Sequence, residues 1–69
     1  MIGKIARVIQ DKGFGFIHSN GKDYFFHKSE NNIDFYAIYG GEEVSFEEVK
    51  SPKGPRAINV RLIGVDDDL

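Results

Sequence analysis

The sequence predicts an all-β protein in which five short antiparallel strands close into a small barrel. Turn signals rich in Gly, Pro, Asn and Asp divide the chain at short, fairly even intervals. The segments between these turns are strand-sized and rich in β-branched and aromatic residues. A sheet made from only 69 residues has little with which to cover its edges, and closure into a barrel removes them.

The expected strands are residues 4–10, 14–18, 23–27, 44–49 and 57–63. The first is rich in β-branched side chains, the second and third in aromatic ones, and the fourth alternates between apolar and polar residues. Asn20 and Gly21 suit a type I′ turn because both tolerate positive φ, so the second and third strands should pair antiparallel. Residues 29–39 have no clean period, and we expect a partly packed connection with a helical turn there.

The composition excludes several kinds of site. The chain has no Cys, which rules out disulfides, thiolate nucleophiles and sulfur-ligated zinc. It has no apolar run of the roughly 20 residues that a membrane span needs, and its first ten residues lack the pattern of a signal peptide. No phosphate-binding loop or metal-ligand spacing is present. We therefore expect a cytoplasmic protein with no cofactor, no bound metal and no membrane contact.

Charge is distributed unevenly along the chain. A formal net charge of -2 argues against a strongly basic nucleic-acid binder. Residues 1–28, however, carry five basic and two acidic side chains, residues 29–49 carry six acidic and no basic ones, and residues 50–63 carry four basic ones. If the first and third segments lie together in space, one face of an acidic protein is basic.

Alternation along the second and third strands gathers aromatic side chains on one face. The hairpin between the strands joins Phe14, Phe16, His18, Phe25 and His27, with Lys12 and Lys28 near the ends of the group. Two interpretations of this face stay open. The phenylalanines could be core, since Phe is commonly buried. Alternatively, aromatic rings beside basic side chains suit stacking on unpaired nucleotides.

Several blocks of the sequence resemble the cold-shock domain family. KGFGFI at 12–17 resembles the first ribonucleoprotein motif of that family, and YFFH at 24–27 resembles the second. Further matching blocks follow in the right order and spacing: GKI at 3–5, VSFE at 44–47, GPRA at 54–57 and NV at 59–60. The resemblance spans about residues 2–61.

The resemblance implies a five-stranded antiparallel OB-type barrel over residues 1–63. The like charges of Asp66, Asp67 and Asp68 predict that residues 64–69 form an acidic, flexible tail. The resemblance also implies a monomer, with dimerisation left open, that binds single-stranded RNA or DNA with low sequence specificity and acts as an RNA chaperone. The candidate binding residues are Arg7, Lys12, Phe14, Phe16, Phe25, His27, Lys28, Phe35 and Arg56, of which Arg7 and Lys28 depart from the family pattern. Tyr36 is an alternative to Phe35 as an aromatic side chain from the long connection.

The sequence departs from the family pattern at two places. The family usually has Lys-Trp-Phe where this chain has Ala6-Arg7-Val8, and it commonly has an aromatic residue where this chain has Lys28. Arg7 can stack through its guanidinium but offers less area than an indole. Because each lost base stack removes about 1–3 kcal/mol, we expect weaker binding than the family's best.

Other functions stay open on the sequence alone. A diverged barrel with weak nucleic-acid binding could serve as a protein-interaction module, and a ribosomal-protein-type RNA-binding barrel would share the ligand class. His18 and His27, with Lys12 nearby, could act as acid and base in RNA cleavage because imidazole titrates near neutrality. We do not expect an enzyme, since histidines on a stacking surface need no catalytic role and barrels of this size rarely enclose a deep pocket.

Overall fold

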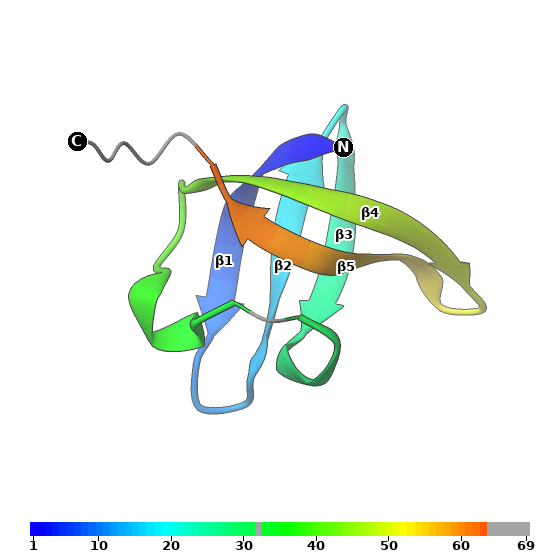
Figure 1. The fold of residues 1–69 in the computed structure, drawn as a ribbon. Coiled ribbons are helices and arrows are strands. Elements are labelled where there is room, and N and C mark those ends of the chain that lie inside the picture. The colour runs from blue at the N-terminus through cyan, green and yellow to red at the C-terminus, as the bar shows by residue number, and fades with distance from the viewer. Residues whose placement is uncertain (32, 64–69) are drawn as a thin grey trace.

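Five strands and two 3₁₀ helices make up the computed structural model, which describes residues 1–31 and 33–63. In chain order the elements are β1 (Ile2–Ile9), β2 (Phe14–Ser19), β3 (Lys22–His27), η1 (Lys28–Glu30), η2 (Phe35–Ala37), β4 (Glu43–Ser51) and β5 (Gly54–Leu62). The strands form a closed barrel in the order β1-β2-β3-β5-β4, and β4 pairs with β1 to complete the ring (Figure 1). The predicted five-stranded all-β barrel is confirmed.

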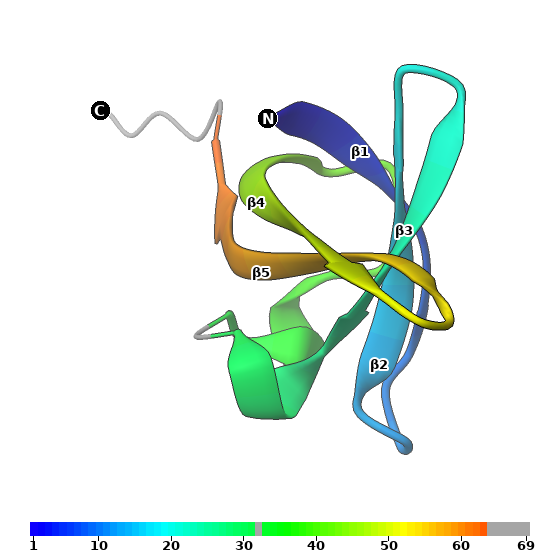
Figure 2. The ribbon, with the colours of Figure 1, turned by 90° about the vertical axis from the view of Figure 1, so that its right-hand side faces the viewer.

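Strand pairing in the barrel is mixed, whereas the sequence predicted purely antiparallel pairing. β3 and β5 run parallel, with Phe25 opposite Arg56, while the other neighbouring strands pair antiparallel. The reason is geometric, because five strands in a closed ring cannot all alternate in direction. Figure 2 shows β4 and β5 crossing obliquely over the sheet formed by β1, β2 and β3. Since β5 lies beside β3, closure also brings the two basic segments of the chain together, which meets the condition for a basic face.

Two hairpins define the ends of the strands. Asn20 and Gly21 have φ values of 52° and 78°, so the predicted tight turn between β2 and β3 is confirmed. β4 and β5 are longer than predicted, because they continue to a turn where Ser51 pairs with Gly54. The Ser51 hydroxyl donates a 2.6 Å hydrogen bond to the Gly54 carbonyl oxygen. The turn signal at residues 52–55 therefore coincides with a hairpin turn between the two strands.

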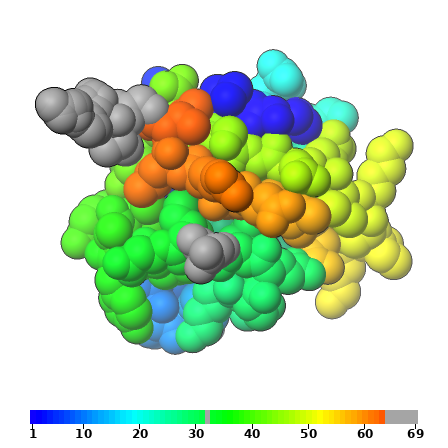
Figure 3. All heavy atoms as spheres, in the orientation of Figure 1, coloured from blue at the N-terminus to red at the C-terminus, as the bar shows by residue number. Residues whose placement is uncertain are grey.

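The connection between β3 and β4 contains both 3₁₀ helices, which confirms the expected helical turn. Phe35 begins η2 and Ile38 follows it as the extended C-cap, and both side chains are buried. Gln10 fastens this segment to the end of β1, because its side-chain amide donates 3.0 Å hydrogen bonds to the carbonyls of both residues. In Figure 3 the connection, coloured green, covers the lower end of the barrel. Among the described residues, no helix is long and apolar enough to cross a membrane.

The buried side chain of Asn31 holds the connection to β5 through hydrogen bonds. Its side-chain amide donates to the carbonyls of His27, at 2.8 Å, and Ala57, at 3.4 Å. Its side-chain oxygen accepts a 2.9 Å hydrogen bond from the backbone N–H of Val60. A single buried amide therefore bridges the end of β3 and the middle of β5.

The core fills the barrel and its covered end. Inward-facing residues alternate with outward-facing ones along β2 and β3, so Ile17, Tyr24 and Phe26 are buried. The buried hydrophobic set is Ile5, Ile17, Tyr24, Phe26, Phe35, Ile38, Val44, Phe46, Ala57 and Val60.

β1 contains an irregularity between Ile5 and Arg7 that the sequence pattern did not reveal. Strict alternation from Gly3 and Ile5, both buried, would direct Arg7 into the barrel. The register shift at Ala6 instead leaves Arg7 exposed and opposite Phe16 on β2. This bulge is therefore what places a cationic side chain on the outer face.

Gly15 is required by close packing rather than by a turn. A Cβ atom at this position would lie 2.6 Å from the Arg7 carbonyl oxygen and 2.9 Å from the ring of Phe26. Both neighbours are held in place, one by the barrel backbone and the other by the core. We expect Gly15→Ala to lower the free energy of unfolding by about 1–3 kcal/mol, measured by urea denaturation. Lys4→Ala, at an exposed position of β1, is the control. An effect of Gly15→Ala no larger than that of Lys4→Ala would contradict the packing argument.

Candidate nucleic-acid interface

Three phenylalanine rings lie together on the outer face of β2 and β3. Phe16 is the register partner of Phe25, and Phe14 lies two residues before Phe16. Ring centroids are 5.5 Å apart for Phe14 and Phe25, 5.9 Å for Phe16 and Phe25, and 6.1 Å for Phe14 and Phe16. All three residues are partly exposed, and none belongs to the buried core. The interpretation of these rings as core is therefore wrong, because they face outward.

His27 extends this aromatic surface. It is the register partner of Phe14, and its ring centroid lies 6.3 Å from that of Phe25. Its Nδ1 atom accepts a 3.0 Å hydrogen bond from the backbone N–H of Ser29, which caps η1. Because Nδ1 is an acceptor, the neutral ring carries its proton on Nε2 and can donate from there. We refer to Phe14, Phe16, Phe25 and His27 as the aromatic platform.

A row of register partners crosses the platform with a cation at each end. Arg7 on β1 lies opposite Phe16 on β2, Phe16 lies opposite Phe25 on β3, and Phe25 lies opposite Arg56 on β5. Neighbouring strands are about 4.8 Å apart, so the four side chains leave the same outer face in a continuous line. An aromatic row with a guanidinium at each end suits a ligand with flat bases. The Arg7 end suits an anionic backbone, whereas the Arg56 guanidinium is paired with the Glu30 carboxylate.

Lys12 and Lys28 lie at the same end of the platform, whereas the sequence placed them only near the ends of the aromatic group. Lys12 is exposed in the turn between β1 and β2. The backbone N–H of Lys28 donates a 2.8 Å hydrogen bond to the Gly13 carbonyl, and the Lys28 stem lies over Gly13. Gly13 has a φ of 72°, a conformation that favours glycine.

His18 lies away from the platform. Its Nδ1 atom is 2.8 Å from a carboxylate oxygen of Asp23, its register partner, and both side chains are exposed. His18 and Phe14 are four residues apart along β2, a separation of about 13 Å. His27 lies opposite Phe14, so the two histidines stand at different levels of the sheet. This arrangement does not bring them together as an acid and a base.

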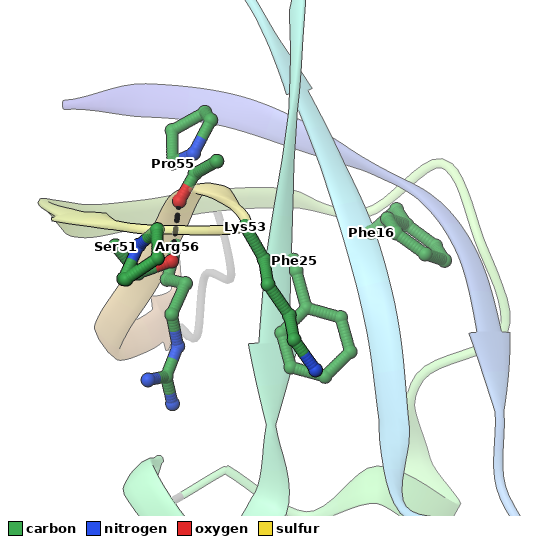
Figure 4. A pocket seen from close by; sticks show the side chains of 8 residues that line it. Phe16, Phe25, Ser51, Lys53, Pro55 and Arg56 are labelled. Atoms are coloured by element: carbon green, nitrogen blue, oxygen red, sulfur yellow. Dashed lines mark hydrogen bonds between the residues drawn. The ribbon is translucent and has the colours of Figure 1, made fainter.

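A hollow of about 620 Å³ lies between the platform and the hairpin that joins β4 to β5. Phe16 and Phe25 line one side, and residues 51–56 line the other (Figure 4). Its basic side chains are Lys53 and Arg56. The guanidinium of Arg56 is paired with the carboxylate of Glu30 on η1. The basic edge of the platform therefore includes one acidic group, which the charge pattern along the sequence did not predict.

Phe35 is not part of the surface, and its prediction as a binding residue is wrong. It is only 5% exposed, and its ring centroid lies 5.2 Å from that of core residue Phe26. The exposed aromatic side chains of the connection are Tyr36 and Tyr39, at 73% and 76%. The spacing of Phe35 and Ile38, three residues apart, is the sequence signal that could have identified both as buried.

Tyr36 and Tyr39 border a second hollow of about 590 Å³ at the end of β1. The Glu42 carboxylate fixes this part of the connection by accepting hydrogen bonds from the backbone N–H groups of Tyr39, at 2.8 Å, and Gly40, at 2.7 Å. Burial raises the pKa of Glu42, but hydrogen bonds from the backbone N–H groups of Tyr39, Gly40 and Glu42 itself outweigh burial and leave the pKa lowered.

The lowered pKa of Glu42 predicts a pH-dependent contribution to stability. A carboxyl group with a lowered pKa in the folded state stabilises the protein above its unfolded pKa, and this contribution is lost as the pH falls through the folded pKa. We expect Glu42→Gln to be less stable than the wild type at neutral pH, with the difference shrinking below about pH 4. Thermal unfolding at several pH values measures this. A difference that is constant with pH would contradict the assignment.

With the geometry of the site established, comparison with known proteins identifies the family. The model of the 'Cold-shock' DNA-binding domain family matches residues 1–63. The chain belongs to this family. The resemblance drawn from the sequence motifs is therefore confirmed.

The alignments with curated relatives span most of this cold-shock domain and most of each relative. It is 37% identical over 65 residues to a cold shock-like protein of Aquifex aeolicus (strain VF5), covering 90% of this chain and 93% of the relative. It is 44% identical over 62 residues to cold shock-like protein CspB of Bacillus cereus, covering 87% and 95%. It is 43% identical over 60 residues to cold shock protein CspD of Bacillus subtilis (strain 168), covering 84% and 91%.

The cold-shock domain brings most of the implicated residues to one face. The platform residues, together with Arg7, Lys12, Lys28 and Arg56, all lie on it or at its borders. Sequence reasoning missed Lys53, because residues 52–55 were interpreted only as a turn, and it missed the pairing of Arg56 with Glu30. Within the described ranges, no group of three or more His, Asp or Glu side chains could hold a metal ion.

Proposed function

We propose that this cold-shock domain binds single-stranded RNA or DNA by stacking bases on the aromatic platform, with little dependence on sequence. The observation that carries the proposal is the outward orientation of Phe14, Phe16 and Phe25, which offer flat apolar faces beside basic side chains. Base stacking on aromatic side chains contributes about 1–3 kcal/mol per base and tolerates every base. Membership of a family described as DNA-binding supports the same ligand class.

The mechanism requires no chemical step. A protein that binds only the unpaired strand stabilises that state by mass action, and so shifts an RNA away from its base-paired structures. The proposed activity is therefore that of an RNA chaperone, acting in the cytoplasm as a monomer and without a cofactor. The proposed binding domain is residues 1–63; the acidic segment 64–69 lies outside the described residues, and we propose no part for it in binding.

The separation of the two histidines favours binding over catalysis. Each Nδ1 atom is occupied by its own neighbour, Asp23 for His18 and Ser29 for His27. A general acid and a general base must both reach the same reacting bond. Histidines at different levels of the sheet do not meet this requirement, so the proposal contains no hydrolytic step.

Salt dependence tests the electrostatic part of the proposal. Arg7, Lys12 and Lys28 supply about three phosphate contacts, and each contact to a single strand contributes about -0.7 to the slope of log affinity against log salt. We expect a slope near -2 for an oligothymidine of about seven nucleotides, measured by fluorescence anisotropy at several NaCl concentrations. A slope near zero would contradict phosphate binding. Failure to bind any oligonucleotide would favour the protein-interaction module.

A further inference from the structure

The Arg56–Glu30 ion pair gives the edge of the platform a chemical character that a simple basic patch lacks. Arg56 leaves β5 opposite Phe25, and Glu30 reaches it from η1. The two side chains are 34% and 35% exposed, so both remain accessible to a ligand. Their opposite charges cancel locally, and Glu30 repels phosphate. This pair is therefore suited to a neutral polar group rather than to the nucleic-acid backbone.

The pair still offers directional hydrogen bonds. A guanidinium carries five N–H donors in a rigid fork, and one terminal nitrogen of Arg56 donates to a Glu30 oxygen. Several donors of Arg56 remain beyond this contact. The Glu30 carboxylate likewise has further lone pairs that can accept from a ligand. A matching ligand presents acceptors to Arg56 and donors to Glu30 at the same time.

The Arg56–Glu30 pair lies where it can contact the edge of a base stacked on Phe25. Phe25 and Arg56 are register partners on neighbouring strands about 4.8 Å apart, and both line the 620 Å³ hollow. Figure 4 shows the Arg56 side chain and the Phe25 ring extending in the same direction from these strands. A base stacked on Phe25 therefore directs one edge toward Arg56, in a hollow large enough for a purine. Lys53, a long side chain lining the same hollow, can meet the adjoining phosphate.

Guanine is the base whose edges match this arrangement. It presents two neighbouring acceptors, O6 and N7, which the guanidinium fork contacts in a bidentate manner. Its N1–H and N2–H₂ donors lie next to O6 and can reach a carboxylate. In a single strand all of these edges are exposed. Adenine and cytosine place an amino donor where guanine has O6, and thymine and uracil lack the second acceptor corresponding to N7.

We propose that the hollow beside Phe25 is a guanine-selective subsite, read by Arg56 and Glu30, within a binding surface that is otherwise tolerant of sequence. This inference rests on the proposed function, because it requires a base on Phe25. It assigns Arg56 to base recognition rather than to phosphate neutralisation. Glu30 has two roles: it positions the Arg56 guanidinium, and it accepts hydrogen bonds from the base.

A substitution scan of the oligonucleotide tests the subsite. Guanine is placed at each position of an otherwise all-thymine strand, and affinities are compared with the all-thymine parent by fluorescence anisotropy. We expect guanine at one position to raise the affinity at least about fivefold, within the range of a bidentate contact. Replacing that guanine by 7-deazaguanine removes N7, and replacing it by hypoxanthine removes the N2 amino group. We expect each change to reduce the gain.

Protein variants assign the effect to the ion pair. Arg56→Lys keeps the positive charge but loses the fork, so we expect the ratio of guanine to thymine affinity to fall to about one. Glu30→Gln should lower the same ratio and make the salt slope steeper, because Arg56 is released for phosphate. Arg61→Lys, an exposed position farther along β5, is the matched control and should leave the ratio unchanged.

The outcomes separate this inference from the proposed function. Binding of the all-thymine strand without a gain from guanine at any position would overturn the guanine subsite and leave the proposed function intact. A gain that persists in Arg56→Lys would also overturn it. No binding to any strand by the folded protein would overturn both proposals.

Discussion

Replacing Phe25 by alanine lowers the affinity for oligothymidine by about 10- to 100-fold. Phe25 is the centre of the platform, with its ring centroid within 6.3 Å of those of Phe14, Phe16 and His27. Its removal eliminates one base stack, at about 1–3 kcal/mol, and removes lateral support from the other rings. Fluorescence anisotropy titrations of wild type and variant at one fixed salt concentration measure the loss.

The matched control for this experiment is Tyr39→Ala. Tyr39 is a more exposed aromatic residue, at 76%, but it belongs to the connection and not to the platform. We expect it to change the affinity less than twofold. Circular dichroism of both variants verifies that the barrel remains folded. Wild-type affinity in Phe25→Ala, or an equal loss in Tyr39→Ala, would contradict the platform and favour a surface on the connection.

Replacing Asn31 by alanine lowers the free energy of unfolding by about 3 kcal/mol. Asn31 is 9% exposed, and its removal leaves the His27 and Ala57 carbonyls and the Val60 N–H without their side-chain partner. An unsatisfied buried group costs about 1–3 kcal/mol, and some of the three regain water. For a domain of this size the loss corresponds to a fall in Tm of about 12–24 °C, measured by calorimetry.

Asn59→Gly is the matched control for this loss of stability. The Asn59 amide makes one exposed hydrogen bond, 3.1 Å long, to Glu47, and its φ of 53° suits glycine. We expect this substitution to change the stability by less than about 0.5 kcal/mol. If Asn31→Ala were equally mild, the buried amide would not be what holds the end of β3 to β5.

Alternation along two strands was sufficient to predict which side chains share a face. It grouped Phe14 and Phe16 with Phe25, and the structure places them together. Alternation could not decide which face is inside, because both faces carry large apolar residues. The family resemblance resolved that ambiguity, and Gly15 explains the result physically, since the inner face has no room for a side chain at that position.

The features that the sequence did not reveal depend on contacts between residues far apart in the chain or on local irregularities of the backbone. The bulge at Ala6 interrupts the period of β1, so alternation alone would direct Arg7 inward. The Arg56–Glu30 pair joins residues from β5 and η1, and no local pattern specifies such a contact. Phe35 was assigned to the surface because its position in the connection resembled that of a family aromatic residue, whereas the 3₁₀ turn directs it into the core.

The most direct test of base stacking is the NMR spectrum of the phenylalanine rings. With the six phenylalanines isotopically labelled, an oligothymidine is added until the protein is saturated. Stacking predicts chemical-shift changes at Phe14, Phe16 and Phe25, upfield ring-current shifts of the thymine methyl protons that lie over these rings, and little change at the buried rings of Phe35 and Phe46. Unchanged signals from the three platform rings at saturation would contradict the account.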